Sequence, residues 1–392
     1  MSFKLLPLQN TIADVEGFSC NGVKAGLKQD DYDVGFIYSD AVCDVSAIFT
    51  TNRFQAAPLK HFKLKKIQKS NFCLVNSKNA NAMTGQAGIE DIEYIINSLH
   101  FDVTGPFMSS TGVIGVRLPK EKIVAAAKSF DFSKKSDINF ARAIMTTDTF
   151  IKKIGFKVIL EDGRSFNIAG IAKGAGMIDP AMATMLCFIA TDADIPKADS
   201  DELLLKHAQT TFNAISVDGD RSTNDSVFLF SNKKSGAYDK EAFSFALYRI
   251  MHELALMIVK DGEGATKLVG FEVTGAKNDS EAKVAAKALT NSLLVKTALF
   301  GEDPNWGRIA ATIGASGVEC YEERLTVAFE DVVVYNKGEI LFDKEREERA
   351  HQVMKKSQFT IRCDLGVADG YFKAYGCDLG YEYIKINAEY RT

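Results

Sequence analysis

Hydroxyl, carboxylate and amide side chains gather in short segments between apolar stretches, and the hydroxyls among them are the groups that could act as nucleophiles. Each segment alone is typical of a turn, because Gly and Asn tolerate positive φ and Ser, Thr and Asp cap helices. Their number instead favours loops that converge on one site. The segments are NSKNANAMTG (76–85), SSTGVIG (109–115), MTTDT (145–149), AKGAGMIDPAMATMLCFIATDA (172–193), SVDGDRSTNDS (216–226), DGEGATK (261–267), GEDPNWGRIAA (301–311) and INAEYRT (386–392).

A hydroxyl nucleophile needs a proton acceptor, and the sequence offers no obvious histidine for this task. Four common signatures, GxSxG, HExxH, GxGxxG and GxxxxGKS/T, are absent, so the familiar serine hydrolases, zinc proteases, dinucleotide enzymes and P-loop enzymes are not indicated. His252 falls in a helical pattern, which favours a structural or surface role for it. The five histidines are scattered along the chain: His61, His100, His207, His252 and His351.

Composition narrows the possible partners and the compartment. The 47 basic and 51 acidic residues are well mixed, so no basic stripe indicates a nucleic acid. The apolar stretch near the N-terminus is short and is broken by Pro7, unlike a secretory or membrane-spanning segment. Seven cysteines without a CxxC pair indicate reduced thiols rather than a disulfide framework or a zinc site. We expect a cytoplasmic protein with no membrane or nucleic-acid partner and no metal.

Apolar periodicity predicts the elements that must position the polar segments. The clearest helix covers 240–260, and the clearest hairpin joins strands on either side of Asp162–Gly163 and leads directly into segment 172–193. The segment 60–69 reads as a strand or a short helix with a solvated face. Further helices are predicted at 90–100, 119–129, 197–213, 280–297 and 342–356, and further strands at 269–275, 325–335, 358–365, 371–378 and 381–387. This mixture predicts an α+β or layered α/β fold with mixed sheets sandwiched by helices.

Seven of the motifs together carry a resemblance to a known family. KGAGMIDPAMATML, STGVIG, MTTDT, DGDRSTNDS, DGEGATK, DPNWGR and the terminal NAEYRT resemble, in order and spacing, the arginine-biosynthesis glutamate N-acetyltransferases, also called ornithine acetyltransferases. The resemblance covers essentially the whole chain. It implies the fold of the self-processing aminopeptidases and ornithine acetyltransferases. The chain departs from the usual family pattern at five positions, none of them the implied nucleophile: Lys78, Met83, Ala175, Ala181 and Arg221.

The resemblance implies that the chain cleaves itself between Ala183 and Thr184. The Thr184 hydroxyl would attack the preceding carbonyl, and water would resolve the resulting ester into an alpha chain, 1–183, and a beta chain, 184–392. The beta chain would complete the catalytic core over about 184–279 and add a smaller C-terminal module from about 280. The freed α-amine of Thr184, with a pKa of about 7.7 to 8.0, would then serve as the missing base. By the same resemblance, two such pairs form an alpha2beta2 assembly.

The resemblance also assigns a reaction and a set of site residues. Thr184 takes the acetyl group of N2-acetylornithine and passes it to L-glutamate by ping-pong chemistry, and the Thr111 hydroxyl and the Gly112 N–H stabilise the oxyanion. No cofactor is implied, and acetyl-CoA is a further candidate acetyl donor. The implied substrate-binding residues are Thr146, Lys173, Thr184, Glu263, Asn387 and Thr392.

Two other functions stay open at this point. A hydrolase of the related self-processing aminopeptidase type would share the architecture but use water in place of glutamate. A non-enzymatic binding protein, whose polar segments are only turns, would remain one intact chain.

Overall fold

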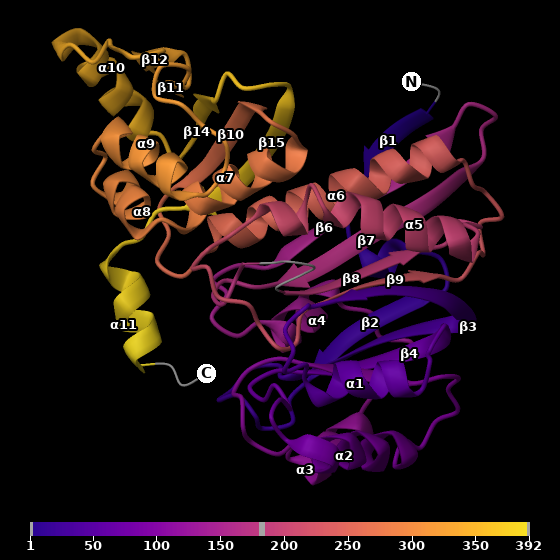
Figure 1. Cartoon of the computed structure of the whole chain (residues 1–392). Helices are drawn as coiled ribbons and strands as arrows, with labels where there is room; N and C mark the ends of the chain where they lie inside the picture. Colours follow the sequence, from indigo (N-terminus) through magenta and orange to yellow (C-terminus); the bar gives the residue numbers. More distant parts are fainter. Residues whose placement is uncertain (1–2, 180–184, 390–392) are drawn as a thin grey trace.

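The computed structural model describes residues 3–179 and 185–389, so the expected cleavage site at Ala183 and Thr184, as well as Ala181 and Thr392, lies outside the described residues. Within these ranges two sheets with covering helices account for most of the chain (Figure 1). The arrangement is the layered mixture of helices and mixed sheets that the periodicity predicts.

The larger sheet contains nine strands over the described residues, in the order β1-β6-β7-β8-β9-β3-β4-β5, with β2 paired to β3. Most neighbours are antiparallel, but β8–β9 and β4–β5 are parallel, so the sheet is mixed. Its strands are β1 Phe3–Pro7, β2 Phe18–Val23, β3 Val34–Phe49, β4 Lys69–Asn76, β5 Phe107–Ser110, β6 Lys152–Leu160, β7 Ser165–Lys173, β8 Leu186–Thr191 and β9 Ser226–Ser231.

Helices cover both faces of this sheet. In Figure 1, α5 and α6 lie across one face and α4 lies on the other, and contacts of α6 with β6 and β7 and of α4 with β2 and β3 agree with this view. Every residue of β8 and β9 is therefore buried, as a central strand between two layers requires. The helices of this part are α1 Ala57–Leu64, α2 Gly85–Asn97, α3 Lys120–Ala127, α4 Asp137–Ile144, α5 Lys197–Ala208 and α6 Lys240–Lys260, with short 3-10 turns at Ile12–Asp14 and Phe212–Ala214.

The helix predicted at 240–260 is confirmed as α6, and the core explains its apolar character. By length and composition alone α6 could cross a membrane. However, Phe243, Leu247, Ile250, Leu254 and Ile258 are fully buried against the sheet. The helix is capped by the Asp239 carboxylate, which accepts a hydrogen bond from the Ala242 N–H. Its end delivers the chain to segment 261–267.

A smaller sheet forms the C-terminal part, in the order β13-β12-β11-β14-β10-β15 over the residues described. The sheet begins with β10 at Leu268. We expected the C-terminal module to start later, at about residue 280. Its helices α7, α9 and α10 share one apolar core with it. Its elements are β10 Leu268–Ala276, α7 Asp279–Asn291, α8 Leu293–Phe300, α9 Trp306–Ala315, β11 Thr326–Phe329, β12 Val332–Asn336, β13 Glu339–Ile340, α10 Lys344–Met354, β14 Gln358–Asp364 and β15 Gly370–Cys377.

Two predicted elements of this part are interrupted. The helix at 280–297 breaks at Ser292, whose extended backbone ends α7 and whose side chain caps α8 by accepting from the Val295 N–H. The strand at 325–335 turns back at Glu330, which has φ +55°, so it is the antiparallel pair β11–β12.

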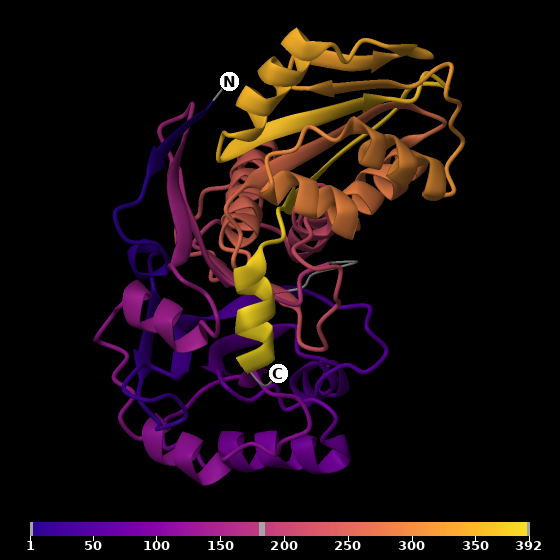
Figure 2. The same ribbon diagram turned by 90° about the vertical axis from the view of Figure 1, so that its left-hand side faces the viewer.

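The strand predicted at 381–387 is wrong, because this segment forms helix α11, Tyr381–Glu389. After β15 the chain leaves the sheet: the Asp378 carboxylate accepts hydrogen bonds from the N–H groups of Thr266 and Lys267. In Figure 2, α11 projects away from the C-terminal sheet toward the larger one. Short stretches with alternating apolar residues do not distinguish a strand from a helix.

Candidate active site

The ends of several polar segments lie together at one edge of the larger sheet. Lys173 at the end of β7 pairs in register with Leu186 at the start of β8, which pairs with Ser226 at the start of β9. Segments 172–193 and 216–226 therefore meet at this edge. Because β8 begins at Leu186, Thr184 lies only two positions before a fixed strand.

A cavity of about 170 Å³ opens at this edge, and its lining includes six of the predicted site residues. Thr111 and Gly112 follow β5, Lys173 ends β7, and Glu263 follows α6, so distant parts of the chain supply the walls. Met185, the neighbour of Thr184, lines the same cavity. The six predicted residues are Thr111, Gly112, Thr146, Lys173, Glu263 and Asn387.

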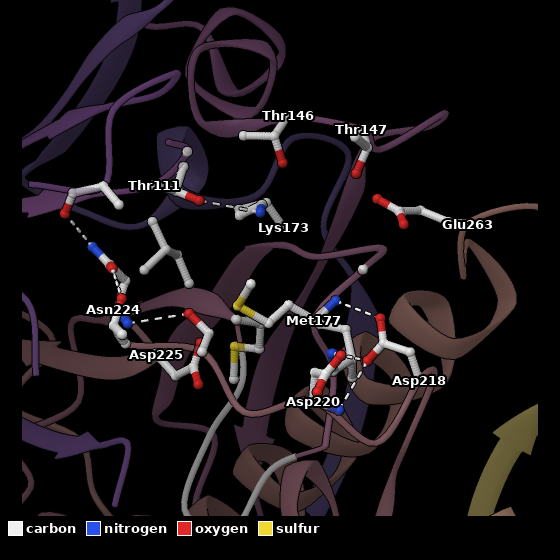
Figure 3. Close-up of a pocket in the computed structure, with 18 of the residues that line it drawn as sticks. Thr111, Thr146, Thr147, Lys173, Met177, Asp218, Asp220, Asn224, Asp225 and Glu263 are labelled. Atoms are coloured by element: carbon white, nitrogen blue, oxygen red, sulfur yellow. Dashed lines mark hydrogen bonds between the residues drawn. The ribbon is translucent and has the colours of Figure 1, made fainter. Parts of the chain in front are cut away.

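Figure 3 shows how these side chains lie. Thr146, Lys173 and Glu263 lie along one side of the cavity, while Asp218 and Asp225 lie along the other. The Lys173 ammonium donates a hydrogen bond of 3.3 Å to the Thr111 hydroxyl. The Lys173 ammonium and the Thr111 hydroxyl therefore lie next to Gly112, which follows Thr111 in the chain.

The backbone around Gly112 leaves no room for a side chain at this position. Its φ is +129°, and a Cβ there would lie 2.3 Å from the Lys78 carbonyl carbon and 2.5 Å from the Asn79 nitrogen. A side chain therefore does not fit without moving the backbone of segment 76–85. Among the described residues, none accepts a hydrogen bond from the Gly112 N–H, which leaves this donor available at the cavity.

A buried ion-pair cluster holds the Lys173 side of the cavity. The Lys152 ammonium lies 2.7 Å from an Asp148 oxygen and 2.5 Å from an Asp261 oxygen, and all three side chains are buried. Asp148 also accepts hydrogen bonds from the N–H groups of Thr146 (3.0 Å) and Gly174 (2.6 Å). The cluster therefore holds the backbone at Thr146 and directly after Lys173.

The charges in this region influence one another. Burial lowers the pKa of Lys173, and the nearby Asp148 carboxylate opposes this effect. Burial would raise the pKa of Asp148, but the ammonium groups of Lys152 and Lys173 outweigh it and hold this pKa below its usual range. Asp148 is therefore an anion at neutral pH, and it favours the charged form of Lys173.

Hydrogen bonds hold both the backbone and the side chain of Glu263. Its N–H donates to the Ala175 carbonyl at 2.9 Å, and one of its carboxylate oxygens accepts a hydrogen bond of 2.7 Å from the Asn387 amide. A Cβ on Gly176 would lie 2.4 Å from the Glu263 carboxyl carbon, so a side chain there would displace this carboxylate. The close approach of α11 depends on Gly264, where a Cβ would lie 2.7 Å from the Tyr383 nitrogen.

Several residues of the cavity were not predicted from the sequence. Asp218 accepts hydrogen bonds from two backbone N–H groups of segment 172–193 and from the Tyr383 hydroxyl, and burial raises its pKa. Asn224 donates to the carbonyls of Ala80 and Ser110 and so joins three polar segments. The signal for both was their place in segment 216–226. Tyr383 carried no signal, because the helix that presents it was predicted as a strand.

The segment 301–311 does not reach this cavity, contrary to expectation. Trp306 begins α9 and stacks on Tyr335 of β12, with ring centroids 5.0 Å apart. It belongs to the core of the C-terminal part. Among the described residues, no group of three or more His, Cys, Asp and Glu side chains could hold a metal ion.

Comparisons with known proteins identify what the chain is similar to. The sequence profile of the ArgJ family matches residues 19–392. An arginine biosynthesis bifunctional protein ArgJ from Wolinella succinogenes is 60% identical over the full length of both chains. A glutamate N-acetyltransferase from Methanopyrus kandleri is 42% identical, with 96% of this chain and 99% of that protein covered.

One solved structure provides a further comparison. The crystal structure of the arginine biosynthesis bifunctional protein argJ from Bacillus halodurans matches with a TM-score of 0.50 and 41% identity. The match covers 53% of this chain and 100% of the solved chain.

Proposed function

Since the chain belongs to the ArgJ family and is an acyltransferase, we propose that it transfers the acetyl group of N2-acetylornithine to L-glutamate, giving ornithine and N-acetylglutamate in arginine biosynthesis. One observation carries the assignment of the site: six residues predicted from separate segments line one cavity, together with the neighbour of Thr184. We expect the reaction to take place in the cytoplasm.

The proposed mechanism begins with self-cleavage. The Thr184 hydroxyl attacks the Ala183 carbonyl carbon, the Ala183–Thr184 amide bond breaks, and an ester links the two chains. Water then hydrolyses this ester, which leaves a carboxylate on Ala183 and frees the hydroxyl and α-amine of Thr184. The solved Bacillus halodurans chain covers 53% of this chain with its full length, and residues 184–392 would make up 209 of the 392, a similar share. This similarity supports a two-chain protein.

Acetyl transfer then proceeds in two steps. The α-amine of Thr184 accepts the hydroxyl proton as the oxygen attacks the acetyl carbonyl, and ornithine leaves with a proton on its amine. The glutamate amine attacks the acetyl ester in turn and restores the threonine. Thr111 and Gly112 are the proposed oxyanion donors. Two observations support this role: the Gly112 N–H donates to no acceptor among residues 3–179 and 185–389, and the Thr111 side chain lines the cavity.

The substrates are α-amino acid derivatives, so the site must bind a carboxylate and orient an amine. We assign the carboxylate to Lys173 and the amine end to Glu263, with Thr146 and Asn387 beside them; Thr392 is also proposed but lies outside the described residues. The Lys173–Glu263 assignment is supported by opposite charges that line the same cavity. No cofactor takes part in these steps, and the alpha and beta chains are proposed to form an alpha2beta2 assembly.

The test replaces the nucleophile and varies the acceptor. With the native enzyme, release of ornithine from N2-acetylornithine should depend on glutamate and should produce N-acetylglutamate. Thr184→Ala should remove both cleavage and transfer, while Thr184→Ser should retain measurable transfer because it keeps the hydroxyl. Acetate release at a rate indifferent to glutamate would instead identify the hydrolase alternative, and turnover by Thr184→Ala would overturn the assigned nucleophile.

A second acetyl donor is also proposed, because the Wolinella succinogenes relative is named a bifunctional protein. We propose that acetyl-CoA acetylates the same threonine. Incubation of the enzyme with acetyl-CoA and glutamate alone should then release free CoA thiol. Absence of thiol release, under conditions where N2-acetylornithine is consumed, would restrict the enzyme to acetylornithine.

A further inference from the structure

The segment that leads into the expected cleavage site is held at several consecutive residues. The Asp218 carboxylate accepts hydrogen bonds from the N–H groups of Met177 (2.6 Å) and Ile178 (2.8 Å). The Ile178 carbonyl accepts hydrogen bonds from the Val217 N–H (2.7 Å) and the Ser216 hydroxyl (3.0 Å). Thus both backbone groups of Ile178 are fixed by segment 216–218.

The next residue is held by the C-terminal part of the molecule. The Asp179 carboxylate forms an ion pair with the Lys287 ammonium of α7 and accepts a hydrogen bond of 3.3 Å from the Asn291 amide. Lys287 also donates to the Ile215 carbonyl at 2.6 Å, so one ammonium links Asp179 to the segment that begins at Ile215. The side chains of Asp179 and Lys287 are 17% and 16% exposed, which limits screening of the pair by water.

The far side of the expected cleavage site is fixed as well. The Met185 carbonyl accepts a hydrogen bond of 2.9 Å from the Ser226 N–H, and β8 begins at the next residue. The chain between Asp179 and Met185 is therefore a short connection between two anchored ends. Anchoring both ends of a short connection restricts the conformations of the bond within it.

We propose that the ion pair between Asp179 and Lys287 is a clamp that positions the Ala183–Thr184 bond for self-cleavage and is not needed for acetyl transfer afterwards. This inference rests on the self-cleavage part of the proposed function. Attack of a hydroxyl on a neighbouring carbonyl requires a close and aligned approach, so a clamp on the flanking segment raises the rate of this step. Neither Asp179 nor Lys287 lines the cavity, which separates the clamp from substrate binding. Lys287 is accordingly a positioning residue.

The test follows cleavage from the moment of synthesis. Native and variant chains are made by cell-free translation, and the fraction of cleaved chain is followed on denaturing gels. Lys287→Met should slow cleavage by about 10- to 100-fold, the cost expected of a small misplacement of reacting groups. Lys287→Arg should retain most of the rate because it keeps the cation. Lys283→Met, one turn earlier on α7 and without contact to Asp179, is the matched control and should cleave normally.

A second measurement separates the clamp from a general loss of structure. Once Lys287→Met has cleaved completely, its kcat and KM for N2-acetylornithine should equal the native values per cleaved molecule. Because an unpaired carboxylate could impair folding, the double variant Asp179→Asn/Lys287→Met removes both charges and should show a native-like Tm with slow cleavage.

Three results would overturn the inference. They are native cleavage rates in Lys287→Met and in the double variant, a loss of kcat in proportion to the loss of cleavage, or slow cleavage in Lys283→Met as well. Failure of the native chain itself to cleave would instead show that the proposed self-cleavage is wrong, so the two ideas fail in distinguishable ways.

Discussion

Lys173 brings a buried cation to the cavity, and its surroundings decide how that charge behaves. Burial lowers its pKa, while the carboxylates of Asp148, Asp225 and Glu263 raise it and Lys152 lowers it further. Lys28 lies close enough to repel it as well. The ammonium therefore loses its proton at a lower pH than an ordinary lysine.

This shift predicts a pH-dependent affinity for the substrates. Below the lowered pKa, Lys173 is charged and attracts the substrate carboxylate; above it, this attraction is lost. KM for N2-acetylornithine should therefore rise with pH in a range below the ordinary lysine value of about 10.4. Steady-state kinetics over an alkaline pH series would measure the rise.

A substitution isolates the contribution of this residue. Lys173→Met should lower kcat/KM by about 10- to 100-fold, which corresponds to the loss of one charge-assisted hydrogen bond, and should remove the alkaline rise in KM. Lys157→Met, at an exposed position of β6, should leave both unchanged. An unchanged alkaline profile in Lys173→Met would show that another group titrates.

At the level of elements, α11 forms a wall of the cavity, although its sequence predicted a strand. None of its described side chains is buried, and it contacts the site through the hydrogen bonds of Tyr383 with Asp218 and of Asn387 with Glu263. These two residues are four apart and lie on one face of the helix. The helix thus completes the cavity without supporting the core.

Truncation should separate these two contributions. A chain that ends at Gly380 lacks α11 and should fold and cleave itself, since the helix buries no side chain, but its kcat/KM should fall by at least about tenfold through the lost contact of Asn387 with Glu263. Circular dichroism, denaturing gels and transfer kinetics would test this. Ile384→Ala, on the exposed face at 66% exposure, is the control and should behave as native. Native kinetics in the truncated chain would exclude α11 from the site.

The fold and the site differ in how far the sequence predicts them. Long, strongly periodic elements such as α6 and the β6–β7 hairpin follow from local pattern, because their apolar faces must be buried. The break at Ser292 and the turn at Glu330 depend on single-residue geometry, which periodicity does not carry.

Site residues were predictable only through whole motifs. Asp218 and Tyr383 meet across 165 positions of sequence, and neither stands out by residue type. Their proximity arises from the crossing of segments in three dimensions, which no local pattern records. The cluster of Asp148, Lys152 and Asp261 was not predicted, for the same reason.

At the scale of the whole molecule, that cluster joins β6, α6 and the cavity loops. Lys152→Met would remove the ammonium that pairs with both buried carboxylates, and breaking a buried pair typically costs about 3–5 kcal/mol. We expect urea unfolding to show a loss of this size. Lys197→Met, which breaks a surface ion pair with Asp201, should cost less than about 1 kcal/mol. Equal small losses in both variants would contradict a structural role for the cluster.

The same cluster predicts the response to acid. The pKa of Asp148 is lowered in the folded protein, so its contribution to stability is present above the unfolded pKa and is lost as pH falls through the folded one. Lys152→Met removes an ammonium that lowers this pKa. The variant should therefore unfold at a higher pH than the native protein in an acid titration followed by circular dichroism, and unfolding at the same pH would argue against this linkage.

The central claim is that breaking the Ala183–Thr184 bond creates the nucleophile and base of the enzyme. A denaturing mass measurement of the purified protein tests it most directly. The account predicts two chains, 1–183 and 184–392, the second with threonine as its first residue. A single species near 43.0 kDa, in a preparation that transfers acetyl groups, would contradict it.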